Sequence, residues 1–249
     1  MYHGISELIR VFLSVMTKNA LIVGAGSGNS ASFARALARQ GAKVALAARN
    51  IEKLDPLTSD IDGISIACDA TDAEQVAALF EQLDQSMGTL DVVLYNPSAF
   101  TAGPVAELDP AKVHQSLMQT AFGAFWVAQQ AAKRMQQAGS GAIFFTGATA
   151  SIKGFPNFSS FAMGKFALRG LTQSLARELG PANIHIAHFI IDGGIASPGR
   201  DLEQQTPASN TDDSMLEPDA IAETYMAVLN QHRSAWSLEV DLRPWKETF

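Results

Sequence analysis

The sequence predicts an α/β fold, a single domain built as a doubly wound parallel sheet with helices on both faces. Short apolar runs alternate with helical segments along the chain, which requires crossover connections and therefore parallel strands. The runs are continuously apolar rather than alternating, as expected for strands that are covered on both sides. No linker, repeat or block of charge divides the chain.

The expected strands are residues 20–23, 43–47, 64–67, 90–94, 142–145, 184–191 and 237–242. The expected helices are residues 31–40, 71–87, 109–137, 159–179 and 217–231. Gly41 ends the first helical pattern, and Thr71 with Glu74 forms a capping-box pattern for the second. Pro110 suits the first turn of the third helix. The polar segment 197–215 is expected to be a surface loop that could cover a ligand.

Composition narrows the class of protein. The chain has 249 residues, of which 47% are hydrophobic and 17% charged, enough apolar surface for a large core. The net charge is −7 and the Lys and Arg residues are scattered, so we expect no nucleic-acid partner. Cys68 is the single cysteine, which excludes an internal disulfide and fits a cytoplasmic location.

The first residues are set apart from the fold pattern. Residues 1–16 contain a short apolar stretch that Arg10 interrupts, too short to span a membrane, and we expect no membrane partner. They also lack the features of a signal peptide. We expect that they form an extra N-terminal helix or that the gene start has been placed too early. The folded domain is expected to cover residues 17–249.

A glycine-rich turn follows the first expected strand. Gly24, Gly26 and Gly28, together with Ser27 and Asn29, stand where the backbone can turn tightly and approach a pyrophosphate at a helix N-terminus. Such turns also occur without a ligand. The pattern therefore predicts a dinucleotide only in combination with other features.

Residues at the ends of the next two strands bear on the choice of dinucleotide. Arg49 stands where proteins that select NAD often carry an acid, and its cation suits a 2′-phosphate. The sequence therefore favours NADP(H) over NAD(H), although Arg49 could equally be a solvated surface cation. Asp69, followed by Ala70, lies where an adenine could bind, or else serves as the N-cap of the next helix.

The order of these motifs resembles the short-chain dehydrogenase/reductase family over residues 17–249. The family's G-x-x-x-G-x-G appears as Gly24, Gly28 and Ser30, and its N-N-A-G motif keeps Asn96. The resemblance implies a Rossmann-like fold with bound NAD(P). The residues that it places around the cofactor are Gly24, Ser27, Gly28, Asn29, Arg49, Asp69, Ala70, Asn96, Lys165 and Gly193, the last within the Asp192-Gly193 pair that stands for the family's P-G.

The family's catalytic set is largely replaced in this chain. Lys165 matches the family lysine, but Phe161 stands at the tyrosine position, Ala148 at the serine position and Thr120 at the asparagine position. Phenylalanine and alanine have no exchangeable proton, so the usual general acid–base step cannot occur through these residues. Lys165 can still bind a ribose with its ammonium, unless it is a surface lysine of the helix.

Other side chains could supply a proton. Thr149 and Ser151 could present a hydroxyl after a small shift of their loop, whereas Ser159 and Ser160 are expected to cap a helix. Tyr95 is expected to wall the nicotinamide pocket, and Tyr225 to lie outside the site. Among the histidines, we expect His185 and His188 to lie in the core and His114 on the surface.

Three functions remain open at this stage. The first is an NADP-dependent oxidoreductase with a non-standard proton route, acting on an unknown small apolar substrate in a pocket lined by Phe155, Phe158 and Phe161, of which at least one belongs to the core. The second is a catalytically silent NADP(H)-binding sensor or oligomer subunit, and the third a scaffold without ligand. The resemblance implies a homodimer or homotetramer, with Trp245 and Phe249 packed on a partner subunit.

Overall fold

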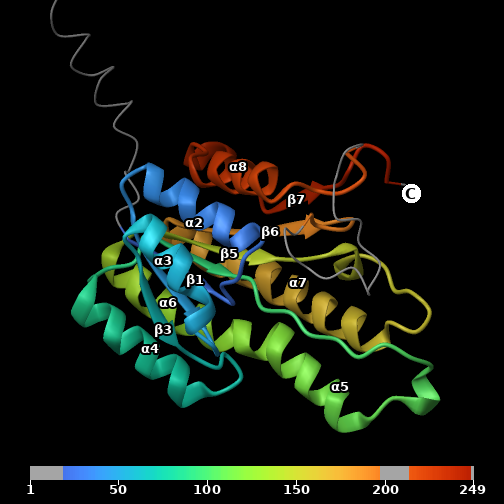
Figure 1. Cartoon of the computed structure of the whole chain (residues 1–249). Helices are drawn as coiled ribbons and strands as arrows, with labels where there is room; N and C mark the ends of the chain where they lie inside the picture. Colours follow the sequence, from blue (N-terminus) through green and yellow to red (C-terminus); the bar gives the residue numbers. More distant parts are fainter. Residues whose placement is uncertain (1–18, 197–212, 248–249) are drawn as a thin grey trace, which may run out of the picture.

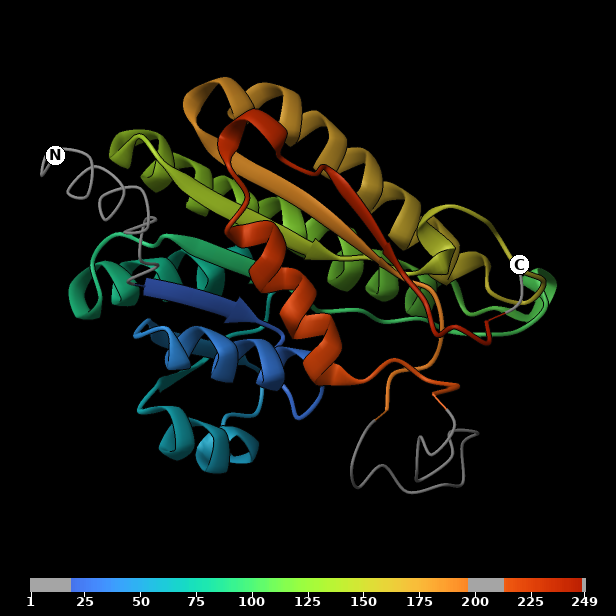
Figure 2. The ribbon, with the colours of Figure 1, turned by 90° about the horizontal axis from the view of Figure 1, so that it is seen from above.

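A single seven-stranded sheet forms the centre of the protein in its computed structural model, which describes residues 19–196 and 213–247. The strand order is β3-β2-β1-β4-β5-β6-β7, and every pairing is parallel. Helices cover both faces, with α2 and α8 on one side and α4, α5 and α6 on the other (Figures 1 and 2). The doubly wound parallel fold expected from the sequence is confirmed.

The elements follow one another in strict alternation along most of the chain. The strands are β1 (Asn19–Val23), β2 (Lys43–Ala48), β3 (Ile64–Ala67), β4 (Val92–Tyr95), β5 (Gly141–Thr146), β6 (Ile184–Ile191) and β7 (Glu239–Leu242). The main helices are α2 (Asn29–Arg39), α3 (Asp55–Ile61), α4 (Ala73–Ser86), α5 (Pro110–Leu117), α6 (Gly123–Ala138), α7 (Ser159–Leu179) and α8 (Pro218–Leu229).

Two hydrophobic layers enclose the sheet. One side of the strands packs on α2, α3 and α8 around Phe33 and Phe189, and the other on α4, α6 and α7 around Phe80 and Phe145. All eight residues of β6 are buried. Burial on both faces explains why the strands appear in the sequence as unbroken apolar runs.

The expected boundaries agree closely with the structure, with three corrections. Helix α3 was not expected from the sequence. The cap of α4 is Asp72, whose side chain accepts from the Glu74 and Gln75 amides, so the expected helix start at Thr71 was wrong. The long helix expected over 109–137 is divided, because a π-helical turn, η3 (Met118–Phe122), separates α5 from α6.

The π-helical turn is held by a buried tyrosine. The Tyr95 hydroxyl at the end of β4 donates to the Gln119 carbonyl oxygen at 2.6 Å. Gly123 lies directly against this contact, since a Cβ there would stand 2.6 Å from the Tyr95 hydroxyl and 2.5 Å from the Ala70 carbonyl oxygen. Tyr95 is fully buried, so the expectation that it walls a ligand pocket was wrong.

The topology fixes where a ligand can bind. Strand order reverses between β1 and β4, and in open parallel sheets the crevice for a ligand forms at that point beyond the carboxyl ends of the strands. None of the helices in the described part of the chain is both long and apolar enough to cross a bilayer. The N-terminal extension, most of the polar segment 197–215 and Phe249 lie outside the described residues.

Replacing Gly123 by alanine tests the packing of the π-helical turn. We expect Gly123→Ala to lower the free energy of unfolding by about 1–3 kcal/mol, because the added methyl overlaps backbone and a fixed hydroxyl. Gly170→Ala is the matched control, since no atom lies within 4 Å of its Cβ position on α7. It should raise stability by up to about 1 kcal/mol. Urea unfolding of both variants measures the difference, and equal effects would contradict the packing argument.

Candidate functional site

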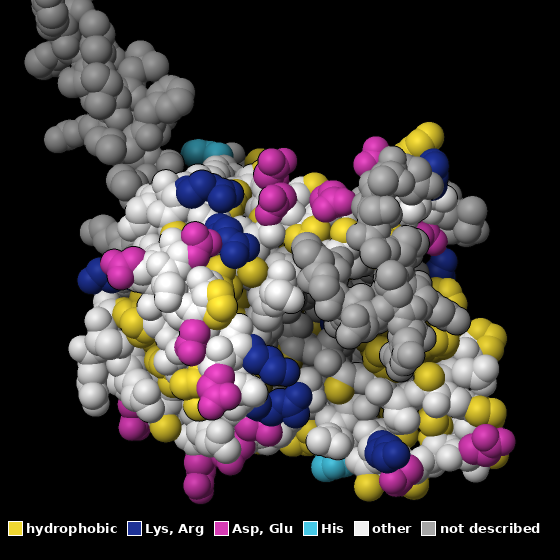
Figure 3. Space-filling view, in the orientation of Figure 1, with side chains coloured by type: hydrophobic (Ala, Val, Ile, Leu, Met, Phe, Trp, Pro, Cys, Tyr) yellow, Lys and Arg dark blue, Asp and Glu magenta, His cyan; other side chains and the backbone are white. Residues whose placement is uncertain are grey.

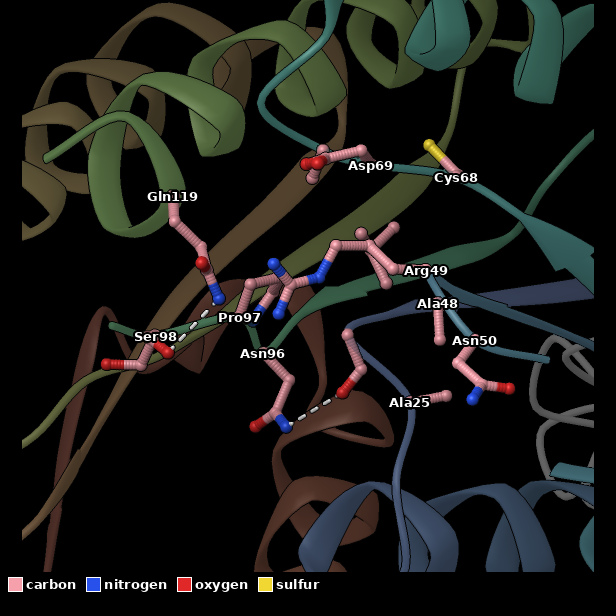
Figure 4. Close-up of a pocket in the computed structure, with 13 residues that line it drawn as sticks. Ala25, Ala48, Arg49, Asn50, Cys68, Asp69, Asn96, Pro97, Ser98 and Gln119 are labelled. Carbon is pink, nitrogen blue, oxygen red and sulfur yellow. Dashed lines mark hydrogen bonds between the residues drawn. The ribbon is translucent and has the colours of Figure 1, made fainter. Parts of the chain in front are cut away.

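A cavity of about 410 Å³ opens at the carboxyl ends of β1, β2, β3 and β4. Figure 4 shows its lining side chains converging from these strand ends and from η3. The residues that line it are Val23, Gly24, Ala25, Ala48, Arg49, Asn50, Cys68, Asp69, Ala70, Asn96, Pro97, Ser98 and Gln119. This is the position that the topology predicts for a ligand.

The glycine turn leaves room for a ligand to lie directly against the backbone. Gly24 has φ +75°, and a Cβ there would lie 2.7 Å from the Pro97 ring, so only glycine fits. Gly26 and Gly28 by contrast face open space within the described structure. Among the described residues no side chain caps α2, so its first amides remain available to an anion, as at other dinucleotide sites.

A short hydrogen bond inside the turn explains the missing third glycine. The Ser30 side chain is buried, and its Oγ accepts from the Gly26 amide at 3.0 Å and approaches the Gly26 carbonyl oxygen at 3.3 Å. Serine therefore ties the turn to the first turn of α2. The departure from the family's motif leaves the turn itself closed and ordered.

A chain of side chains links the turn to the centre of the sheet. Asn96 donates to the Gly24 carbonyl oxygen at 3.3 Å, and Asn29 donates to Asn96 at 3.1 Å. Asn29 Nδ2 also lies 3.4 Å from the Tyr225 hydroxyl, which is 3.0 Å from Thr146 Oγ1. Tyr225 does not line the cavity, in keeping with the expectation, but its buried hydroxyl belongs to the hydrogen-bonded chain behind it. Its place on the inner face of α8 could not be known without the packing of α8 on α2.

Arg49 and Asp69 border the cavity on opposite sides. Figure 4 shows the exposed Arg49 side chain extended across the cavity, with its guanidinium between Asp69 and Asn96. Asp69 accepts from the Thr71 amide and hydroxyl at 2.9 and 2.7 Å, and the helix cap is Asp72, so the N-cap interpretation of Asp69 was wrong. Ser27 is exposed on the turn, and Ala70 is buried in the lining.

Lys165 lies inside the protein rather than on its surface. It is 2% exposed, and its Nζ donates to the Thr146 carbonyl oxygen at 2.8 Å. Burial lowers the pKa of Lys165 to about 7. The alternative of a solvated helix lysine is therefore wrong.

The three substituted positions lie on α7 or on segments that pack against it. The Phe161 ring centroid lies 5.8 Å from Lys165 Nζ, one helical turn away on α7. Thr120 is fully buried in η3 beside α7, where a Cβ on Gly164 would stand 3.0 Å from the Thr120 Cβ. Ala148 is partly exposed and precedes the short 3-10 helix Thr149–Ser151, which also packs on α7.

The other hydroxyls near the site have partners of their own. Thr149 donates to the Asp192 carboxylate, which also pairs with Arg243 at 3.3 Å. Ser151 is fully buried and accepts from the Ala148 amide at 3.2 Å. Ser160 was expected to cap α7, but its hydroxyl bonds the Thr101 backbone instead, at 2.8 and 3.0 Å.

A buried histidine lies beneath the turn that carries Ala148. His188 Nε2 is 3.3 Å from Ser151 Oγ, and its Nδ1 is 3.5 Å from Glu239, which Arg169 holds through two hydrogen bonds of 2.6 and 2.8 Å. Burial, the largest cause, lowers the pKa of His188 to about 4. His188 and His185 are core residues and His114 is exposed, as expected.

Aromatic side chains form a cluster at the open side of the site. The Phe100 ring lies 5.2 Å from Phe161 and 5.9 Å from Phe158, centroid to centroid. Phe100 is 55% exposed and Phe158 38%. Phe155 is exposed as well, and Phe161 is half-buried. The expectation that at least one of Phe155, Phe158 and Phe161 is a core residue was therefore wrong. Hydrophobic side chains gather at the lower right of the molecule's face in Figure 3.

The turn after β6 also needs a glycine. Gly193 has φ +143°, and a Cβ there would lie 2.7 Å from the Pro244 ring. Asp192, where the family has proline, is anchored by its amide to the Leu242 carbonyl oxygen at 2.8 Å. The pair holds the end of β6 against the segment after β7.

Comparison with known proteins identifies the family. The family model described as short chain dehydrogenase matches residues 18–206. An uncharacterized oxidoreductase of Staphylococcus aureus is 30% identical over 240 residues, which cover 93% of this chain and 100% of that protein. The chain therefore belongs to the short-chain dehydrogenase/reductase family of oxidoreductases, which bind nicotinamide cofactors.

Solved structures support the same assignment. The crystal structure of a short-chain dehydrogenase from Rhodopseudomonas palustris has a TM-score of 0.78 and 33% identity, over 92% of this chain and 99% of that chain. A metagenomic short-chain oxidoreductase solved in complex with NADP has a TM-score of 0.78 and 25% identity, over 92% of this chain and 98% of its own.

The buried His188 predicts a pH dependence of stability. The pKa of His188 is lowered to about 4 in the folded protein. As the pH falls, the unfolded chain therefore binds a proton at this histidine near pH 6.5, whereas the folded protein binds it only near pH 4. Stability is therefore lost between these values, by about 2–3 kcal/mol at pH 4.5. His188→Gln should remove most of this loss, measured by urea unfolding at pH 7 and pH 4.5.

The exposed His114 provides the control for this measurement. His114→Gln should show the same loss of stability on acidification as the unmodified protein. An unchanged pH dependence in His188→Gln would contradict the assignment of a neutral buried imidazole.

Proposed function

We propose that this protein is an NADP(H)-dependent oxidoreductase that acts on a small apolar substrate without the family's tyrosine. The observation that carries the proposal is the buried Lys165, which is connected to the glycine turn by a chain of hydrogen bonds through Thr146, Tyr225, Asn29 and Asn96. A chain that had lost its ligand would have no need to keep a lysine 2% exposed within hydrogen-bond reach of a strand end.

The residues present fit a dinucleotide. Gly24, Ser27, Gly28 and Asn29 would hold the pyrophosphate at the start of α2, and Asn96 braces the turn from behind. Asp69 and Ala70 would border the adenine, and Lys165 and Gly193 the nicotinamide half. When bound, the cofactor supplies a hydride or accepts one.

Arg49 supports NADP(H) over NAD(H). Its guanidinium lies in the cavity, and Ala48, at the end of β2, offers no carboxylate for the ribose hydroxyls. A guanidinium binds a phosphate through charge-assisted hydrogen bonds, whereas an unphosphorylated ribose gives it little to bind. The NADP-bound relative is consistent with this preference.

The aromatic cluster supports an apolar substrate. Phe100 and Phe158 lie on two loops that are joined by the bonds of Ser160 to Thr101 and by the Gly103 amide, which donates to the Asn157 carbonyl oxygen at 2.9 Å. The joined loops place the Phe100 ring against the Phe158 and Phe161 rings. An apolar wall of this kind favours a flat uncharged molecule.

Exposed aromatic side chains on η3, α6 and α7 support association with a second copy. Phe122 at the end of η3 is 47% exposed, Phe125 on α6 is 39% exposed, and Phe166 on α7 is 45% exposed. A groove of about 220 Å³ between these helices ends at Phe125. We propose a homodimer or homotetramer that buries this face. Trp245, 75% exposed after β7, is a second contact in this proposal.

Binding of the reduced dinucleotides tests the cofactor assignment. Fluorescence titration should show NADPH bound at least about tenfold more tightly than NADH. Arg49→Ala should weaken NADPH about 10- to 100-fold, because a charge-assisted contact to the phosphate is lost, and leave NADH unchanged. Arg39→Ala, exposed at the end of α2, should change neither affinity. Loss of NADPH and NADH binding together in Arg49→Ala would contradict a role in selecting the phosphate.

Restoring the family hydroxyls tests the catalytic half of the proposal. Phe161→Tyr combined with Ala148→Ser should raise NADPH-dependent reduction of acetophenone by about 100-fold or more, because a positioned general acid contributes that much. Consumption of NADPH measures the rate, with each single variant beside the double. No gain in a double variant that still binds NADPH would favour a silent nucleotide-binding protein over an oxidoreductase.

A further inference from the structure

Few side chains at this site have a proton to give. Of the four positions that carry the family's chemistry, Ala148 and Phe161 have no exchangeable proton. The Thr120 hydroxyl is fully buried and is engaged with one residue in both directions, donating to the Ala99 carbonyl oxygen and accepting from the Ala99 amide, each at 3.2 Å. Lys165 is the remaining member of the set.

The neighbouring hydroxyls are engaged elsewhere. Thr149 gives its proton to the Asp192 carboxylate, and Ser160 gives its own to the Thr101 carbonyl oxygen. Ser151 is fully buried against His188 and the Ala148 amide. Tyr95 donates to the Gln119 carbonyl oxygen in η3, and burial raises the pKa of its phenol far above neutrality. Each would have to break an existing hydrogen bond to reach a substrate.

Lys165 differs from these groups in having spare donors. An ammonium carries three N–H groups, and the Thr146 carbonyl oxygen takes one of them. Within the described residues no carboxylate lies in salt-bridge range of Nζ, whose other neighbour is the Phe161 ring at 5.8 Å. An ammonium buried without a counter-ion gives up its proton readily, and burial places the pKa of Lys165 at about 7.

The groups around Lys165 do not compensate its charge. On β5, Lys165 donates a hydrogen bond to the Thr146 carbonyl oxygen. On β6, its charge adds to the lowering of the pKa of His188, which burial already lowers, so His188 is neutral at pH 7. Glu239 on β7 lies behind His188 and is bonded to Arg169. On α8, the Tyr225 hydroxyl bonds Thr146, and burial raises its pKa to about 12. Within the described part of the chain, the contacts that stabilise the positive charge are thus with a carbonyl oxygen and an aromatic ring, and none is with a carboxylate.

We propose that Lys165 itself donates the proton of the reduction, in place of the missing phenol. The inference rests on the proposed function. In the reduction of an uncharged C=O group, the dihydronicotinamide supplies a hydride with both electrons, and one N–H bond of Lys165 breaks to supply the proton. The products are the hydroxy compound, the oxidised cofactor and a neutral amine, which regains its proton from water. In the reverse direction the amine is the base.

The test uses the full-length protein with NADPH and 9,10-phenanthrenequinone, a flat uncharged dicarbonyl that fits an aromatic wall. Lys165→Arg keeps a cation that can bind the ribose but that does not release a proton at neutral pH. It should bind NADPH within about tenfold of the unmodified protein and lose about 100-fold or more in reduction rate. Lys43→Arg, exposed at the opposite end of the strands, is the matched control.

The pH dependence of the reduction rate distinguishes proton donation by Lys165 from a purely structural role of this residue. The reduction rate of the unmodified protein should be flat at low pH and fall tenfold per pH unit above about 7. In the protein without cofactor, the ¹³Cε signal of Lys165, assigned by its absence in Lys165→Arg, should titrate near the same pH. A Lys165 that titrates above pH 9, or a Lys165→Arg variant that keeps its rate, overturns the inference.

Two further outcomes distinguish failure of proton donation by Lys165 from failure of the proposed NADP(H)-dependent function. If the unmodified protein binds NADPH but reduces no quinone, proton donation by Lys165 is overturned and the cofactor site stands. If it binds neither NADPH nor NADH, the proposed function itself is overturned. Phe161→Tyr in the Lys165→Arg background should recover part of the lost rate, because the phenol then supplies the proton, and failure to recover any also counts against the inference.

Discussion

Thr146 at the end of β5 is hydrogen-bonded from both faces of the sheet. Its carbonyl oxygen accepts from Lys165 on α7, and its hydroxyl pairs with Tyr225 on α8. Tyr225 in turn reaches Asn29 at the start of α2, and Asn29 reaches Asn96 beyond β4. These polar groups are buried, so each depends on its neighbours for satisfaction. The glycine turn, the sheet and the lysine are therefore positioned as one unit.

This unit explains why the site can lose catalytic hydroxyls without losing its shape. The lysine is held by a backbone carbonyl and by burial, neither of which needs the phenol of the family's tyrosine. Phe161 keeps the ring in place against Nζ, where it provides a cation–π contact. The departures at Phe161 and Ala148 therefore remove two hydroxyls and leave the hydrogen bond that holds Lys165 in place.

Sequence patterns predicted the sheet and the pairing of Phe161 with Lys165 because both depend on local order along the chain, whereas the positions of Ala148 and Thr120 came from the family resemblance. Unbroken apolar runs follow from burial on two faces, and an i, i+4 spacing fixes Phe161 and Lys165 on one side of α7. Tyr225 was missed because its role depends on α8 packing on α2, which joins residues 196 positions apart. The π-helical turn was missed because Tyr95, far earlier in the chain, stabilises it.

This chain lacks both family hydroxyls, with Phe161 and Ala148 at their positions. In a partly buried site a hydroxyl without a partner costs about 1–3 kcal/mol. A tyrosine in place of Phe161 alone would present one such group to an apolar wall. The aromatic cluster of Phe100, Phe158 and Phe161 extends that wall to the solvent. Under the proposed function, a site built in this way favours substrates whose reduction requires only a hydride and one proton.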